Sequence, residues 1–64
     1  ASPLTEREAQ VLREAASGST AQQIAAALFL SAGTVRNYLS AAMAKTGAST
    51  RQDAVRIATE NGWL

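Results

Sequence analysis

The sequence predicts an all-α fold, a compact domain of four helices. Each of four apolar-striped segments begins at a Ser or Thr, residues that cap helix N-termini readily. Three of the segments end at a glycine, which tolerates the left-handed backbone that closes many helices. No segment alternates between apolar and polar residues as a strand does. The 64 residues, 47% of them hydrophobic, therefore fit one small helical domain.

The first helix is predicted over residues 6–17. The Thr5 hydroxyl can accept a hydrogen bond from the amide of Glu8, and the Glu8 carboxylate can reach back to the amide of Thr5. Leu4 precedes this capping box and is placed to pack on the first turns, and Gly18 ends the helix. The expected apolar side of this helix consists of Val11, Leu12, Ala15 and Ala16.

The second helix is predicted over residues 21–28, with Thr20 as its cap and Gln23 as the reciprocal partner. Its apolar side consists of Ile24, Ala25 and Leu28. After a three-residue turn, Ser31 caps the third helix, which is predicted over residues 32–46. A short helix, a tight turn and a longer helix make a helix-turn-helix at the centre of the domain.

The third helix is predicted to end at Gly47, and the fourth to cover residues 51–61. Either Ser49 or Thr50 caps the fourth helix, and Gly62 ends it. Its inward side carries Ala54, Ile57 and Ala58. The short connections between the four segments favour one compact packing of helices.

The polar side of the third helix carries the functional signal. The guanidinium of Arg36 matches O6 and N7 of guanine, the amide of Asn37 matches N6 and N7 of adenine, and the Ser40 hydroxyl can donate or accept. Residues 32–44 contain no acid, whereas a solvated helix usually carries Lys–Glu pairs. This favours a helix that enters the major groove of DNA; an ordinary amphipathic helix that lacks acids is the alternative.

The distribution of charge points the same way, although the net charge is only +1. Residues 18–52 contain no acid and three basic residues, namely Arg36, Lys45 and Arg51. The segments on either side are net negative. A basic centre favours an anionic partner such as nucleic acid, and a scatter of solvated surface charges is the alternative.

Composition excludes several other classes of function. The chain has no cysteine and no histidine and shows no paired-carboxylate or nucleophile arrangement, so we expect no enzyme, no metal and no cofactor. No apolar run approaches the ~18 residues of a membrane span, and no signal peptide is visible, so we expect a cytoplasmic protein without a membrane partner. The chain begins at Ala1 without an initiator Met, so we expect a single domain, residues 1–64, excised from a longer protein.

The chain resembles the DNA-binding domain of the LuxR/NarL/FixJ (GerE-type) transcription regulators over nearly all of its length. The matching positions are Leu4-Thr5-Glu6-Arg7-Glu8, Val11-Leu12, Ala16, Gly18, Ile24-Ala25, Leu28, Leu30-Ser31, Thr34-Val35-Arg36-Asn37-Tyr38-Leu39, Lys45, Gly47, Arg51 and Ala54. The resemblance implies sequence-specific binding of double-stranded DNA by a homodimer on two half-sites, with the fourth helix as the dimer contact. It also implies an N-terminal receiver or ligand-sensing domain in the full-length protein, which is typical of response regulators.

The resemblance assigns roles to individual positions. The expected base contacts are Arg36, Asn37 and Ser40. The expected contacts to the DNA backbone are Thr20, Thr34, Tyr38, Lys45 and Arg51. The expected dimer interface consists of Val55 and Thr59, which lie beside the apolar side of the fourth helix.

Several of these positions also have a purely structural interpretation. Thr20 caps a helix, Tyr38 can be a half-buried core aromatic, and Lys45 can complement the dipole at a helix C-terminus. Arg51 can form a surface ion pair in the first turn of the fourth helix, and Val55 and Thr59 can simply lie at the edge of the core. The alternative function is a helical protein-interaction or dimerisation module that does not bind DNA.

Overall fold

The computed structural model describes residues 1–64 and consists of four α-helices. They are α1 (Glu6–Ala16), α2 (Ala21–Leu28), α3 (Ala32–Thr46) and α4 (Arg51–Glu60). The predicted all-α, four-helix fold is confirmed. Helices α1 and α4 each end one residue earlier than predicted, because Ser17 and Asn61 act as C-caps. The Ser17 hydroxyl donates to the carbonyl of Glu14, and the Asn61 amide donates to the carbonyl of Ile57.

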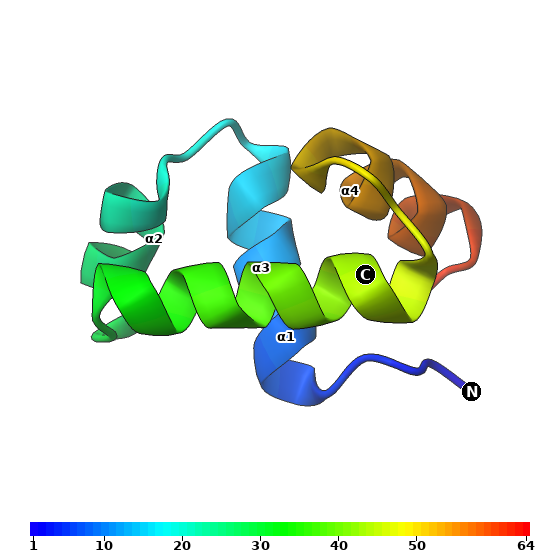
Figure 1. Ribbon diagram of the computed structural model, residues 1–64, viewed down its shortest axis with the longest axis horizontal. Coiled ribbons are helices and arrows are strands. Elements are labelled where there is room, and N and C mark those ends of the chain that lie inside the picture. Colours follow the sequence, from blue (N-terminus) through cyan, green and yellow to red (C-terminus); the bar gives the residue numbers. More distant parts are fainter.

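Helices α1 and α3 form the centre of the domain. Figure 1 shows α3 lying across the molecule, with α1 crossing behind it, α2 beside its N-terminal end and α4 beside its C-terminal end. Both α1 and α3 contact all of the other helices, whereas α2 and α4 make no contact with each other. The orientation of α3 is therefore set by α1 together with one helix at each end.

The core lies where α1 meets the other three helices. Its largest fully buried side chains are Val11, Leu12, Ile24 and Val35. Alanines at the helix crossings complete it, since Ala42, Ala54 and Ala58 are also fully buried and allow the backbones to approach closely. Leu28, predicted to point inward, is half-buried and packs against this core. Ile57 is half-buried but does not pack against the core, and Ala16, predicted on the apolar side of α1, is exposed because it lies beyond the helix crossings.

The predicted helix starts are confirmed. In α1 the Glu8 amide donates to the Thr5 hydroxyl at 3.2 Å and the Thr5 amide donates to the Glu8 carboxylate at 2.8 Å. The same reciprocal pair joins Thr20 and Gln23 in α2. Ser31 caps α3. Of the two candidates for α4, Thr50 is the cap.

The turn between α2 and α3 is closed by Phe29, which adopts the left-handed conformation with φ of 58°. Its amide and that of Leu30 both donate to the carbonyl of Ala25, which completes the last turn of α2. The ring of Phe29 is 95% exposed.

None of the four helices combines the length and apolar character that crossing a membrane requires.

Candidate nucleic-acid interface

The solvent-facing side of α3 is the candidate interface. Val35, Leu39 and Ala42 are buried on the inner side. Arg36, Asn37 and Ser40 are exposed, and their side chains form no hydrogen bond or ion pair within the domain. The periodicity of the helix therefore brings the three predicted base-contact residues together on one exposed side.

This side of α3 is chemically suited to base edges. It offers a bidentate donor in Arg36, a paired donor and acceptor in Asn37 and a hydroxyl in Ser40, all free to take external partners. Gly33 and Ala44 are exposed on the same side, so little side-chain bulk separates the helix backbone from a surface that it approaches. No acid lies in the first turn of α3. Contact of these residues with bases stays a prediction.

Thr34 and Tyr38 lie at the edge of the exposed side. Both are half-buried, and Tyr38 packs against the core, as its structural interpretation anticipates. The Ser31 hydroxyl donates to the Thr34 hydroxyl at 2.8 Å and accepts from the Thr34 amide. Thr34 thereby belongs to the capping network of α3, while the Tyr38 hydroxyl has no partner inside the domain.

Lys45 is engaged inside the fold. Its Nζ atom donates to the two carboxylate oxygens of Glu8 at 2.8 and 3.1 Å. The Glu8 side chain is only 7% exposed, while that of Lys45 is 36% exposed. Sequence reasoning missed this pair, because the two residues are 37 positions apart and the Glu8 carboxylate already had a local partner in Thr5.

The surroundings of Glu8 shift its acidity. Burial of the carboxylate is the largest single influence and by itself would raise the pKa. The hydrogen bonds from Lys45 and from the Thr5 amide, together with the charge of Lys45, outweigh burial and hold the pKa of Glu8 below its ordinary value of 4.5. Glu8 is therefore ionised and paired at neutral pH.

Arg51 also has a partner inside the fold. Its Nη2 atom donates to the carbonyl of Ser19 at 2.6 Å, which ties the first turn of α4 to the loop before α2. Thr20, the next residue, is exposed and its hydroxyl accepts from the Gln23 amide. The structure thus brings Thr20 and Arg51, two predicted backbone contacts, to neighbouring positions at the start of α2.

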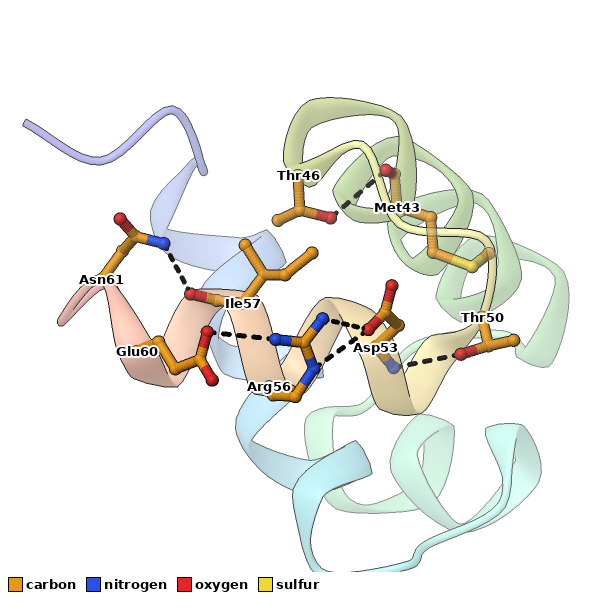
Figure 2. Close-up of polar contacts among 8 residues, drawn as sticks. All are labelled: Met43, Thr46, Thr50, Asp53, Arg56, Ile57, Glu60 and Asn61. Atoms are coloured by element: carbon orange, nitrogen blue, oxygen red, sulfur yellow. Dashed lines mark hydrogen bonds and ion pairs between the residues drawn. The ribbon is translucent and has the colours of Figure 1, made fainter.

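The outward side of α4 carries a small ion-pair network that sequence reasoning did not single out. Arg56 lies between Asp53 and Glu60 and donates to both, at 2.5 and 3.1 Å (Figure 2). The hydrogen bond to Asp53 and then that to Glu60, with the charges of both, raise the pKa of Arg56 above its ordinary value. The spacings of three and four residues are the signal that could have revealed it.

The predicted dimer residues lie on the same helix. Val55 is half-buried and packs against the core, and Thr59 is exposed with its hydroxyl donating to the Val55 carbonyl at 2.7 Å. Their role in a dimer stays a prediction. Val55 also borders an open hollow of about 190 Å³ between α1 and α4. The hollow is lined by Ala15, Ala16, Gly18, Arg51, Gln52 and Val55.

Comparison with known proteins matches this chain to one protein family and to several of its members. Residues 2–58 match the family described as bacterial regulatory proteins, luxR family. The chain is 50% identical over 62 residues to the uncharacterized transcriptional regulatory protein YvfU of Bacillus subtilis strain 168, covering 97% of this chain and 31% of that protein. It is 52% identical over 61 residues to the response regulator RamR of Streptomyces coelicolor, covering 95% of this chain and 30% of that protein.

A shorter relative is the spore germination protein GerE of Bacillus subtilis, which is 44% identical over 52 residues. That match covers 81% of this chain and 70% of GerE. The chain thus spans about a third of the length of YvfU and RamR but most of the length of GerE.

The Glu8–Lys45 pair leads to an asymmetric stability prediction. Lys45→Met strands a buried carboxylate and is expected to reduce the free energy of unfolding by about 2 kcal/mol. Glu8→Gln keeps an acceptor for the Thr5 amide and leaves a half-exposed ammonium in water, so about 1 kcal/mol is expected. Urea unfolding at neutral pH measures both values, and an equal or larger loss for Glu8→Gln would contradict this account.

Lowering the pH tests the same Glu8–Lys45 pair in a second way. Because the pKa of Glu8 is lower in the folded than in the unfolded chain, its pairing stabilises the fold above pH 4.5, and this stabilisation is lost as the pH falls through the folded-state pKa. Glu8→Gln lacks this component of the pH dependence. The deficit of Lys45→Met should shrink in acid, since protonation removes the stranded charge. Urea unfolding of the three proteins over an acid series measures these differences.

Proposed function

The chain belongs to the luxR family of bacterial regulatory proteins, whose members are DNA-binding transcription regulators rather than enzymes, and we propose that it reads a specific double-stranded DNA sequence with α3 in the major groove. In a helix-turn-helix the second helix enters the groove and its exposed side meets the base edges. Here that helix is α3, and α2 precedes it after a three-residue turn.

One observation carries this proposal: the exposed side of α3 holds Arg36, Asn37 and Ser40 with no internal partner and no neighbouring acid in the helix. Unpaired polar groups on a fixed helix can exchange water for base edges without breaking a contact of the fold. Arg36 would pair with guanine and Asn37 with adenine, while Ser40 adapts to either.

Contacts to phosphates would come from the edges of the same surface. Thr20 and Thr34 offer hydroxyl groups beside helix N-termini, and Tyr38 offers a free phenolic hydroxyl. Lys45 and Arg51 would contribute the donors that Glu8 and Ser19 leave free. Because both side chains are already held inside the fold, we infer that phosphates add less to affinity than in a strongly basic domain.

Dimerisation would supply the affinity that one domain lacks. We place the two-fold contact at Val55 and Thr59 on α4, on the side of the helix without the Asp53–Arg56–Glu60 network. Two domains joined there would read two half-sites about one helical turn apart. The adjoining hollow offers additional surface to a partner copy.

In a longer regulator this domain would be the output unit. The chain covers about a third of YvfU and of RamR, and RamR is named a response regulator. We infer that a receiver or ligand-sensing domain of the full-length protein controls when two DNA-binding domains come together.

Selection of bound sequences from a random DNA pool at two salt concentrations tests the proposed function. A two-fold motif is expected, with log affinity falling against log salt with a slope of about −2 to −3 per domain, since few phosphates are neutralised. Two tethered copies provide a second arm with higher affinity. Absence of enrichment with both the single and the tethered protein would refute DNA reading and leave a protein-interaction module.

Substitution of the base-reading residues should separate binding from folding. Arg36→Ala and Asn37→Ala are each expected to weaken binding of the selected site by about 1–3 kcal/mol, because each removes a paired contact to a base edge. Arg13→Ala is the matched control, since Arg13 is an exposed arginine on α1 without an internal partner. Fluorescence titration measures affinity and circular dichroism measures the fold. Unchanged affinity in both α3 variants would refute the assignment.

The dimer contact has its own test. Thr59→Glu would oppose two carboxylates across the two-fold axis, so the affinity gain of a two-half-site fragment over a single half-site should fall by about tenfold or more. Ala27→Glu on α2 is the control, because Ala27 is exposed and α2 does not contact α4. Single half-site affinity should not change in Thr59→Glu. An unchanged gain would exclude this edge of α4 as the interface.

A further inference from the structure

Phe29 is unfavourable for the isolated fold in two ways. It is the one non-glycine residue with positive φ, a conformation that is strained for a bulky side chain. Its ring is also 95% exposed, and no other large hydrophobic side chain is exposed in the domain. Both features would disappear if glycine occupied this position.

The fold makes no visible use of the ring. The hydrogen bonds that end α2 come from the backbone amides of Phe29 and Leu30, and any residue other than proline supplies them. Phe29 does not belong to the hydrophobic core or to the side chains packed against it. A residue that strains the backbone without stabilising the domain points to a role in contact with another molecule.

The position of Phe29 in the fold indicates which kind of molecule its ring would contact. The residue lies two positions before Ser31, which caps α3, so it sits at the N-terminal end of the helix that carries Arg36 and Asn37. In Figure 1 the α2–α3 turn lies at the end of α3 that is remote from α4, and therefore far from the proposed dimer contact.

The electrostatic surroundings favour an anionic partner. Arg7 donates to the carbonyl of Leu28, the residue before Phe29, at 3.5 Å. Residues 18–35 contain no charged side chain, so the turn itself brings no acid. The acids beside Arg7 are Glu6 and Glu8 of α1, and Glu8 is paired with Lys45. An exposed aromatic side chain on an uncharged turn, with an arginine bound to the preceding carbonyl, suits the deoxyribose and thymine methyl groups of DNA, which lie next to phosphates.

We propose that the Phe29 ring is an additional DNA contact, packing against a thymine methyl group or a deoxyribose at the edge of the half-site that α3 reads. This inference rests on the proposed function. It extends the DNA-contacting surface from α3 onto the preceding turn and makes Phe29 a specificity-determining residue where the contact is a thymine methyl.

The test compares three substitutions at one position. Phe29→Gly and Phe29→Asn remove the ring and suit the left-handed backbone, so the thermal midpoint should hold or rise, by about 4 °C for glycine. The dissociation constant for a single half-site should increase about tenfold in both, as expected for partial burial of a phenyl ring. Phe29→Tyr keeps the ring and should bind within about twofold of the parent.

Modified DNA identifies the group that is contacted. Replacing edge thymines by uracil removes only the methyl group, so a weaker complex with the parent but not with Phe29→Gly would identify a methyl contact. Equal binding of the thymine and uracil sites, with the tenfold loss retained in Phe29→Gly, would identify the sugar. Ala26→Ser, at an exposed α2 position near the turn, is the matched control and should change neither measurement.

Three results would overturn the proposal. Unchanged half-site affinity in Phe29→Gly would exclude a DNA contact and leave the ring to a protein partner. A marked fall of the thermal midpoint in Phe29→Gly would show that the ring supports the fold. Failure of the parent to bind any DNA would refute the proposed function and this inference together. That result can be told apart from failure of the Phe29 contact alone, because the parent and Arg36→Ala would then behave alike.

Discussion

The arrangement of the domain depends on the buried carboxylate of Glu8. Glu8 is the one buried charged residue of the domain, and its carboxylate accepts hydrogen bonds from the Thr5 amide and from Lys45. The first of these begins α1, and the second fixes the C-terminal end of α3 against it. Since α1 and α3 are the helices that contact all others, one carboxylate joins the start of the scaffold to the end of the proposed reading helix. A buried ion pair of this kind need not add much stability, but it specifies one orientation.

Most other basic residues also have hydrogen-bond or ion-pair partners within the domain. Lys45 pairs with Glu8 and Arg56 with two acids, while Arg51 donates to the Ser19 carbonyl and Arg7 to Gln10 and the Leu28 carbonyl. Four of the six basic side chains therefore have partners within the domain. Arg36 is the one cation of α3 without an internal partner. In the DNA reading that we propose, such a surface would rely on directional hydrogen bonds more than on attraction to phosphates, which would favour sequence discrimination over tight nonspecific binding.

Local rules account for what could be predicted from the sequence. The caps at Thr5, Thr20 and Ser31 involve residues three positions apart, so their geometry is implied by the pattern, and helical periodicity is enough to expose Arg36 and Asn37. Contacts between distant residues were not accessible in this way. Neither the Glu8–Lys45 pair nor the Arg51–Ser19 bond has a sequence signature, because each depends on how two helices cross.

The turn and the site itself show two further limits of sequence reasoning. A left-handed C-cap is normally glycine, so the pattern gave no reason to expect that Phe29 would adopt it with an exposed ring. For the proposed base-contact residues, exposure follows from helical periodicity, whereas the identity of the bases would depend on how α3 is oriented in a groove of DNA.

The two edges of α4 illustrate how charge restricts assembly. A two-fold contact places each residue close to its own copy or to a neighbour of it. On the edge formed by Asp53, Arg56 and Glu60, such a contact would bring together networks that each carry one more acid than base, and it would disturb ion pairs already formed. Val55 and Thr59 are themselves uncharged, and the hollow beside them contains one charged residue, Arg51, whose guanidinium donates to the Ser19 carbonyl. Because Arg56 is already paired within its own helix, a contact on that side would disturb existing ion pairs, and the side that carries Val55 and Thr59 is therefore the one that we propose for a contact between two copies.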